Sequence, residues 1–259
     1  MDAIIFDFLS TQNKKLLLKN VKIVFSYDGS KFCGSQKQCN KKSVEDKILE
    51  ALKVYGIQTK IILSGRTDTG VHAVGQCANF FVDDFWANDL EKFRKIINYQ
   101  LSPYIFAKHC EIVDTKFHSR YDAKTRTYRY IINTSEYNVF GADYFYFHYL
   151  NDITKLQECV KLFQGTHDFE YFSKTGSCTK TTIRTIYDAR IYKYKNFIIF
   201  KFEANGFLRS QIRMMVGALL SLSEGKITLD DLDNQILKIK KASTKLAPAS
   251  GLYLCRIKY

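Results

Sequence analysis

The sequence predicts an α+β protein of two similar domains, each a mostly antiparallel sheet flanked by helices. Two observations support this prediction. Segments with alternating apolar residues come in pairs between amphipathic helical segments, and this order of strands and helices occurs twice along the chain. The length of 259 residues also fits two domains at a prior of about 150 residues each. We therefore predict a leader over residues 1–19, an N-terminal domain over 20–115 and a C-terminal domain over 116–259.

The first half begins with a strand, since Val21, Ile23 and Phe25 alternate with Lys22 and Val24. Capping boxes then predict two helices, one opened by Ser43 with Asp46 and one by Asn88 with Glu91. The elements expected here are strands at 21–25, 61–64, 76–82 and 104–113 and helices at 43–56 and 88–101.

The second half contains the clearest alternation of the chain, from Ile183 to Ile191, which predicts a hairpin with residues 196–204. A long apolar stripe from Leu208 to Leu222 predicts a buried helix, and Thr228 with Asp231 opens the last one. The remaining expected elements are strands at 124–133 and 252–257 and a helix at 156–163.

Positive charge is the main compositional signal. Lys and Arg exceed Asp and Glu by 39 − 26 = +13, which favours a polyanionic partner. The excess is concentrated between Tyr171 and Val216, where interleaved aromatic residues suit a nucleic-acid groove, although a solvated hairpin would have the same composition. The basic residues of this stretch are Lys174, Lys180, Arg184, Arg190, Lys193, Lys195, Lys201, Arg209 and Arg213.

Several classes of protein are disfavoured. No segment approaches the ~18 consecutive apolar residues of a membrane span, and Asp2 and Asp7 stand where a secretory signal would be basic. The seven cysteines form no Cys-x-x-Cys pair, so neither a zinc site nor a disulfide framework is expected. We expect a reduced, cytoplasmic setting.

The most informative stretch is the glycine-bounded loop from Ser64 to Gln76. In an extended loop Arg66 and Asp68 would point to one side, and a guanidinium favours the ionised carboxylate that a nucleophile or base needs. A structural ion pair in a turn would show the same spacing. Asp68-Thr69-Gly70 is also the tripeptide of aspartic proteases, but those enzymes need two facing carboxylates that share a proton. This chain has one, so only a homodimer could supply the second.

The loop Gly65-Arg66-Thr67-Asp68-x-Gly70-Val71-His72-Ala73-x-Gly75-Gln76 resembles the signature of the TruA-type tRNA pseudouridine synthases. Further resemblances follow in the family's order along nearly the whole chain. They are Tyr27-Asp28-Gly29-x-x-Phe32-x-Gly34, Phe117-His118-Ser119-Arg120, Arg126-x-Tyr128-Arg129-Tyr130, Gly165-x-His167-Asp168-Phe169, Arg184-Thr185-Ile186, Ala204-Asn205-Gly206-Phe207-Leu208-Arg209 and Ala247-Pro248-Ala249-x-Gly251-Leu252.

The resemblance implies an isomerase that converts uridine to pseudouridine at positions 38, 39 and 40 of the tRNA anticodon stem-loop. It implies a basic cleft between two α+β domains, a homodimer, and no metal or cofactor. Asp68 would be the catalytic aspartate, Tyr128 would stack on the target uracil, and Arg213 would pair with Asp68. Arg66 would hold the extruded nucleotide. Arg184 and Arg209, in the basic stretch, are expected to bind the RNA backbone.

Two positions depart from the family pattern. Ser35 stands where an aromatic residue usually follows Gly34, and Met214 where an asparagine often follows the arginine. Two alternative functions also stay open at this point: a catalytically silent tRNA-binding protein of the same fold, and the same chemistry on another RNA.

Overall fold

The computed structural model describes residues 18–39, 41–174, 176 and 179–259. Residues 1–17 of the expected leader lie outside this part of the chain, and the first strand begins at Lys19. The strands are β1 Lys19–Tyr27, β2 Ile62–Leu63, β3 His72–Val82, β4 Ile105–Val113, β5 Thr125–Asn133, β6 Tyr146–Phe147, β7 Gly165–Asp168, β8 Ile183–Tyr194, β9 Phe197–Ala204 and β10 Leu252–Lys258. The α-helices are α2 Val44–Val54, α3 Asp84–Ala87, α4 Leu90–Leu101, α5 Ile153–Cys159, α6 Gln211–Ser223 and α7 Leu229–Ile236.

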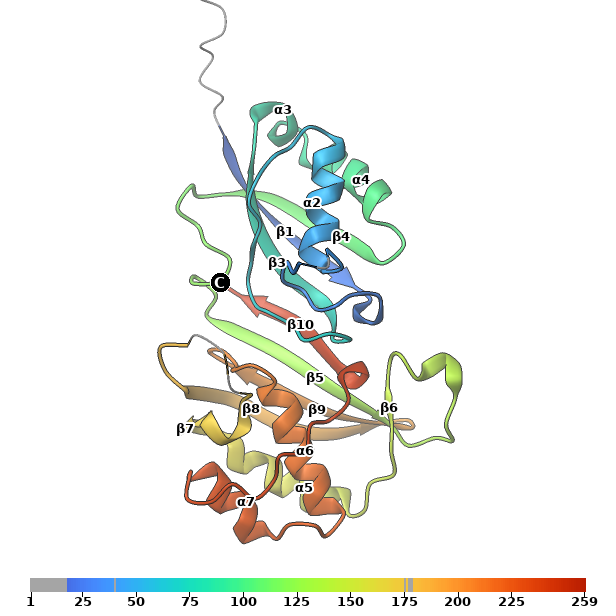
Figure 1. The fold of residues 1–259 in the computed structure, drawn as a ribbon, viewed down its shortest axis with the longest axis vertical. Coiled ribbons are helices and arrows are strands. Elements are labelled where there is room, and N and C mark those ends of the chain that lie inside the picture. The colour runs from blue at the N-terminus through green and yellow to red at the C-terminus, as the bar shows by residue number, and fades with distance from the viewer. Residues whose placement is uncertain (1–17, 40, 175, 177–178) are drawn as a thin grey trace, which may run out of the picture.

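The described strands form one sheet that joins the two halves of the chain. Its order is β4-β1-β3-β10-β5-β9-β8-β7, with β2 added beside β3 and β6 beside β5. All pairs are antiparallel except β10 with β3 and β5 with β6. The C-terminal strand β10 is the junction, and Figure 1 shows it lying beside β5 between the two helical layers. The predicted α+β class is confirmed, whereas the division at residue 115 stays a prediction.

The sequence signals explain where the elements begin. The predicted capping boxes of α2, at Ser43 and Asp46, and of α7, at Thr228 and Asp231, are both present. The box expected at Asn88 is wrong by one residue: Asp89 caps α4, and the short helix α3 occupies the preceding residues. The helix expected over 156–163 is divided into α5 and a 3₁₀ turn at Val160–Phe163.

Helices cover each half of the sheet. In the upper half of Figure 1, α4 packs against β4 and α2 against α4. In the lower half, α6 is buried along most of its length and contacts α5 and α7. Buried apolar residues from both halves make one continuous core. Within the described residues, no helix is long and apolar enough to cross a membrane.

Candidate active site

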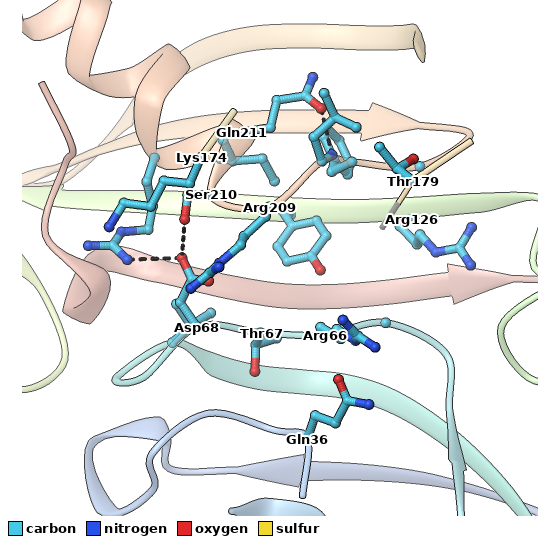
Figure 2. A pocket seen from close by; sticks show the side chains of 18 of the residues that line it. Gln36, Arg66, Thr67, Asp68, Arg126, Lys174, Thr179, Arg209, Ser210 and Gln211 are labelled. Carbon is cyan, nitrogen blue, oxygen red and sulfur yellow. Dashed lines mark hydrogen bonds and ion pairs between the residues drawn. The ribbon is translucent and has the colours of Figure 1, made fainter. Parts of the chain in front are cut away.

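A cleft of about 900 Å³ lies where the two halves meet. Its walls are the loop between β2 and β3, the start of β5 and the loop from β9 into α6 (Figure 2). All six residues singled out from the sequence line it: Arg66, Asp68, Tyr128, Arg184, Arg209 and Arg213. Segments more than a hundred residues apart in the chain therefore share one cavity.

Asp68 is held by two donors from the other half of the chain. Its Oδ2 accepts hydrogen bonds from the Ser210 hydroxyl at 2.7 Å and from Arg213 Nη1 at 3.0 Å, both drawn in Figure 2. The Arg213 side chain is 13% exposed, and its Nε donates to the Ala247 carbonyl at 2.8 Å. The carboxylate thus lies by the first turn of α6, where the helix dipole favours negative charge. Among the described residues, Asp68 Oδ1 has no hydrogen-bond partner, so one oxygen stays available to a substrate.

Arg66 does not lie beside Asp68 as an extended loop would place it. Figure 2 shows the two side chains leaving the backbone in different directions on either side of Thr67. The loop turns at this point, because the Val71 N–H donates to the Asp68 carbonyl and Gly70 adopts φ +79°. Among the described residues Asp68 makes no ion pair with Arg66, so the expected Arg66–Asp68 pairing is wrong, and the ion pair of Asp68 is with Arg213.

Thr67 anchors the loop to the turn after β1. Its N–H donates to Ser35 Oγ at 2.9 Å, and its carbonyl accepts from the Ser35 N–H at 3.2 Å. Its hydroxyl is 2.8 Å from the hydroxyl of Tyr27, whose pKa is raised to about 12 by burial. Gly34, at φ +92°, lets the two backbones approach, because a Cβ there would lie 2.9 Å from the Thr67 carbonyl oxygen. Ser35, the departure from the family pattern, is fully buried in this junction.

Arg126 ties the start of the loop to its surroundings. It donates to the carbonyl of Ser64 at 3.1 Å, and to those of Arg120 at 2.6 Å and Asn205 at 2.8 Å. Burial lowers the pKa of this guanidinium. Because its Nη groups donate to backbone carbonyls, Arg126 holds the wall of the cleft in place.

His72 closes the loop at its other end. Its Nδ1 accepts from the Gly29 N–H at 3.0 Å, which leaves Nε2 to donate to the Asp143 carbonyl at 2.8 Å. The ring stacks on Tyr253 with centroids 4.7 Å apart. Burial lowers the pKa of His72, so the imidazole is neutral and structural.

Tyr128 presents its ring to the cleft from the start of β5. The residue is 7% exposed, and its ring meets that of Phe207 edge-on, with centroids 5.3 Å apart and planes at 84°. Burial raises the pKa of its hydroxyl well above the usual value, so the ring is a neutral aromatic surface at neutral pH. A flat neutral ring in a cleft suits stacking on a base.

The basic stretch does not form a single groove. Of its nine basic residues, those that line the cleft are Lys174, Arg184, Arg209 and Arg213. Arg190 and Lys201 both pair with Asp188 on the hairpin. Arg184 spends part of its guanidinium on the carbonyls of Thr181 and Ile183. Of the interleaved aromatics, Phe172 is buried in the core.

Ser210 is the site residue that sequence reasoning missed. It adopts φ +60° immediately before α6, a left-handed conformation that non-glycine residues rarely adopt. No local sequence signal marks such a serine, because its partner Asp68 is 142 residues away. Only the assembled fold shows why a hydroxyl stands there.

Comparison with known proteins identifies the chain. A family model described as tRNA pseudouridine synthase matches residues 23–122 and 159–259. The chain belongs to the tRNA pseudouridine synthase family. It is 44% identical to a tRNA pseudouridine synthase A of Campylobacter jejuni subsp. doylei over 93% of this chain and 100% of that one. A relative of that name from Wolinella succinogenes is 39% identical over 90% of this chain and 92% of its own. One from Acetivibrio thermocellus is 37% identical over 93% and 100%.

Family membership confirms the predicted enzyme class, an isomerase that forms pseudouridine. It excludes the aspartic-protease interpretation, and the geometry agrees, since Asp68 is paired with a guanidinium rather than with a second carboxylate. Within the described residues, no three His, Cys, Asp or Glu side chains come together as metal ligands.

Proposed function

We propose that the protein converts uridine to pseudouridine at positions 38, 39 and 40 of the tRNA anticodon stem-loop, with Asp68 acting on the ribose. The observation that carries this proposal is the state of the Asp68 carboxylate. Ser210 and Arg213 hold Oδ2, while Oδ1 is free of partners among the described residues and lies in a cleft with an aromatic ring.

The reaction breaks the bond between N1 of uracil and C1′ and forms a bond between C5 and C1′. The C5 proton is lost and N1 gains one, so the product is an isomer and no net oxidation occurs. Asp68 either attacks C1′ or removes the C2′ proton, and both routes need an ionised carboxylate at the ribose. The hydrogen bond and ion pair on Oδ2 stabilise that charge.

The surrounding residues have separate roles in this proposal. The target base leaves the RNA stack, which costs a few kcal/mol, and stacking on Tyr128 offsets that cost. Arg66, which is exposed, fills the space that the base leaves. Arg184 and Arg209 contact phosphates at the edge of the cleft, although the hydrogen bonds of Arg184 to backbone carbonyls leave it fewer free donors. Arg213 is a positioning residue that acts through Asp68.

We also propose that the protein works as a homodimer in the cytoplasm. Support for the dimer is family resemblance. Support for the location is the pattern of scattered cysteines, which form no Cys-x-x-Cys pair.

The test uses unmodified tRNA transcripts with uridine at positions 38, 39 and 40, and matched transcripts with cytidine at each position in turn. Pseudouridine is mapped by carbodiimide-dependent primer-extension stops. We expect stops only at those positions, lost with each cytidine replacement. Modification at another position would overturn the substrate assignment, and binding without any modification would indicate a silent tRNA-binding protein.

A further inference from the structure

A smaller hollow borders the cleft, and of the residues that line it only Arg66 has a role in the function proposed above. It lies by β2 and by the turn that precedes β5. Five residues line both hollows, namely Gln36, Gly65, Arg66, Arg120 and Tyr121. The two cavities therefore form one continuous surface, with Tyr121 and two guanidinium groups at the border.

Tyr121 is held in place yet open to solvent. Its ring stacks on His118, with centroids 4.2 Å apart and planes at 26°, while the residue stays 76% exposed. His118 is fixed in turn, because its Nδ1 accepts from the N–H groups of Arg120 and Tyr121 at 3.2 and 3.3 Å. The His118 N–H also donates to Asp122 at 2.8 Å. A large exposed ring on a prebuilt support loses little entropy when it binds a flat ligand.

The charge around this ring is positive. The Arg120 guanidinium lies 5.9 Å from the Tyr121 ring centroid, and Arg66 is exposed. In the part of the chain that the structure describes, neither guanidinium has an ion pair. Glu45 is the one carboxylate among the residues that line the smaller hollow, and it accepts from the Lys37 N–H at 2.9 Å. A phosphate would therefore be favoured on the side of the hollow formed by Arg66 and Arg120.

We propose that Tyr121 is a stacking platform for a nucleotide adjacent to the reacting uridine, and that Arg120 contacts a phosphate beside it. This inference rests on the proposed function, which places the target nucleotide in the main cleft. The RNA chain must continue beyond that nucleotide, and the shared border leads directly to Tyr121. An aromatic face flanked by guanidinium groups is how proteins bind unstacked bases.

The test measures RNA affinity in an Asp68→Asn background, where no turnover intervenes. The probe is a fluorescent, unmodified anticodon stem-loop oligoribonucleotide. We expect Tyr121→Ala to weaken binding about 5- to 100-fold and Tyr121→Phe to stay within about twofold, because phenylalanine keeps the aromatic face. Tyr121→Leu should resemble alanine. The matched control is Tyr99→Ala, which removes a tyrosine that is 83% exposed on α4 and should bind as the parent does.

Salt dependence separates the two contacts. Arg120→Gln should reduce the slope of log K against log salt by about 0.7 to 0.9, the value for one phosphate. Tyr121→Ala should leave this slope unchanged, because stacking releases no counterions. An unchanged slope for Arg120→Gln would overturn the phosphate contact.

If Tyr121→Ala binds RNA as tightly as Tyr99→Ala, the proposal of a stacking platform is overturned. Tyr121 then only stabilises its turn, and the melting temperature of Tyr121→Ala should be lowered. Turnover by the wild-type protein on the same RNA is measured in parallel. Absence of pseudouridine there overturns the proposed function, whereas the affinity comparison decides the platform independently.

Discussion

The loop that carries Asp68 and the cations around it are built in opposite ways. In the loop, Thr67 makes three hydrogen bonds to Ser35 and Tyr27, and Asp68 is held by Ser210 and Arg213. The side chains of Arg66, Lys174 and Arg209, here termed the cationic rim, are exposed. Among the described residues they make no hydrogen bond or ion pair with their side chains.

In the function proposed above, this contrast separates the residues that carry out the chemistry from those that bind the RNA. A carboxylate that must act on one atom gains from being fixed before the substrate arrives, since no reorganisation is then needed at the moment of reaction. Cations that must meet a flexible polyanion gain from staying unpaired, because each can then displace counterions from a phosphate. Substitutions in the loop should therefore lower kcat, and substitutions in the rim should weaken binding.

The largest effect among the supporting residues is expected at Arg213. Arg213→Ala removes both the charge beside Asp68 and a hydrogen bond to it, so kcat should fall about 100-fold while RNA affinity changes little. Arg213→Lys keeps the charge and should recover part of the rate. The rate is measured as single-turnover formation of pseudouridine. If Arg213→Ala reacts within about threefold of the wild-type rate, Arg213 does not position Asp68.

Ser210 should show a smaller effect of the same kind. Ser210→Ala removes one hydrogen bond to a charged group and should lower kcat about 10-fold with little change in KM. Ser210→Gly is the informative companion, because glycine accepts φ +60° without strain. It should be as slow as alanine yet more heat-stable. A glycine variant with the wild-type rate would show that the hydroxyl has no role in positioning Asp68.

Substitutions in the cationic rim should change the affinity for RNA rather than kcat. Arg209→Gln and Lys174→Gln should each weaken RNA affinity about 3- to 10-fold, with kcat at saturation unchanged. Each should also reduce the slope of log K against log salt by the value for about one phosphate contact. Lys193→Gln is the matched control, since Lys193 is exposed on β8 outside the cleft. Equal losses at Lys193 and Arg209 would place the RNA along the hairpin.

The smallest effect is a pH dependence of stability from His72. Burial lowers the folded-state pKa of His72 below its ordinary value of about 6.5. The unfolded chain then binds more protons than the folded chain. The contribution of His72 to the free energy of unfolding is therefore complete above the ordinary pKa, and it decreases as the pH falls toward the lowered pKa. The melting temperature should decrease as the pH is lowered below about 6.5, and His72→Gln should make the melting temperature depend less on pH in this range. An equal slope in the variant would assign the pH dependence to other groups.

The sequence predicted what is local. Alternation located β1, β8 and β9, and capping boxes located α2 and α7, because these patterns depend on neighbours a few residues apart. The missed helix α3 is only four residues long, too short for a periodic signal. The predicted position of the active-site loop rested on its glycines and on family resemblance.

What could not be predicted depends on contacts between distant residues. Strand β10 lies between β3 and β5, although its own residues say nothing about its partners. The partner of Asp68 is Arg213, 145 residues away, whereas the spacing of Arg66 suggested a nearer one. The family resemblance named Arg213, but it gave no sign of Ser210 or of the Ser35–Thr67 junction.

The most direct test compares Asp68→Asn with wild type on one anticodon stem-loop RNA, measuring the single-turnover rate and the dissociation constant together. Asparagine keeps the shape of the side chain and removes the ionised oxygen. The rate should fall at least about 1,000-fold, while the dissociation constant stays within about threefold, because the cationic rim is intact. Pseudouridine formation at a rate near that of wild type would contradict the assignment of Asp68 as the reacting group.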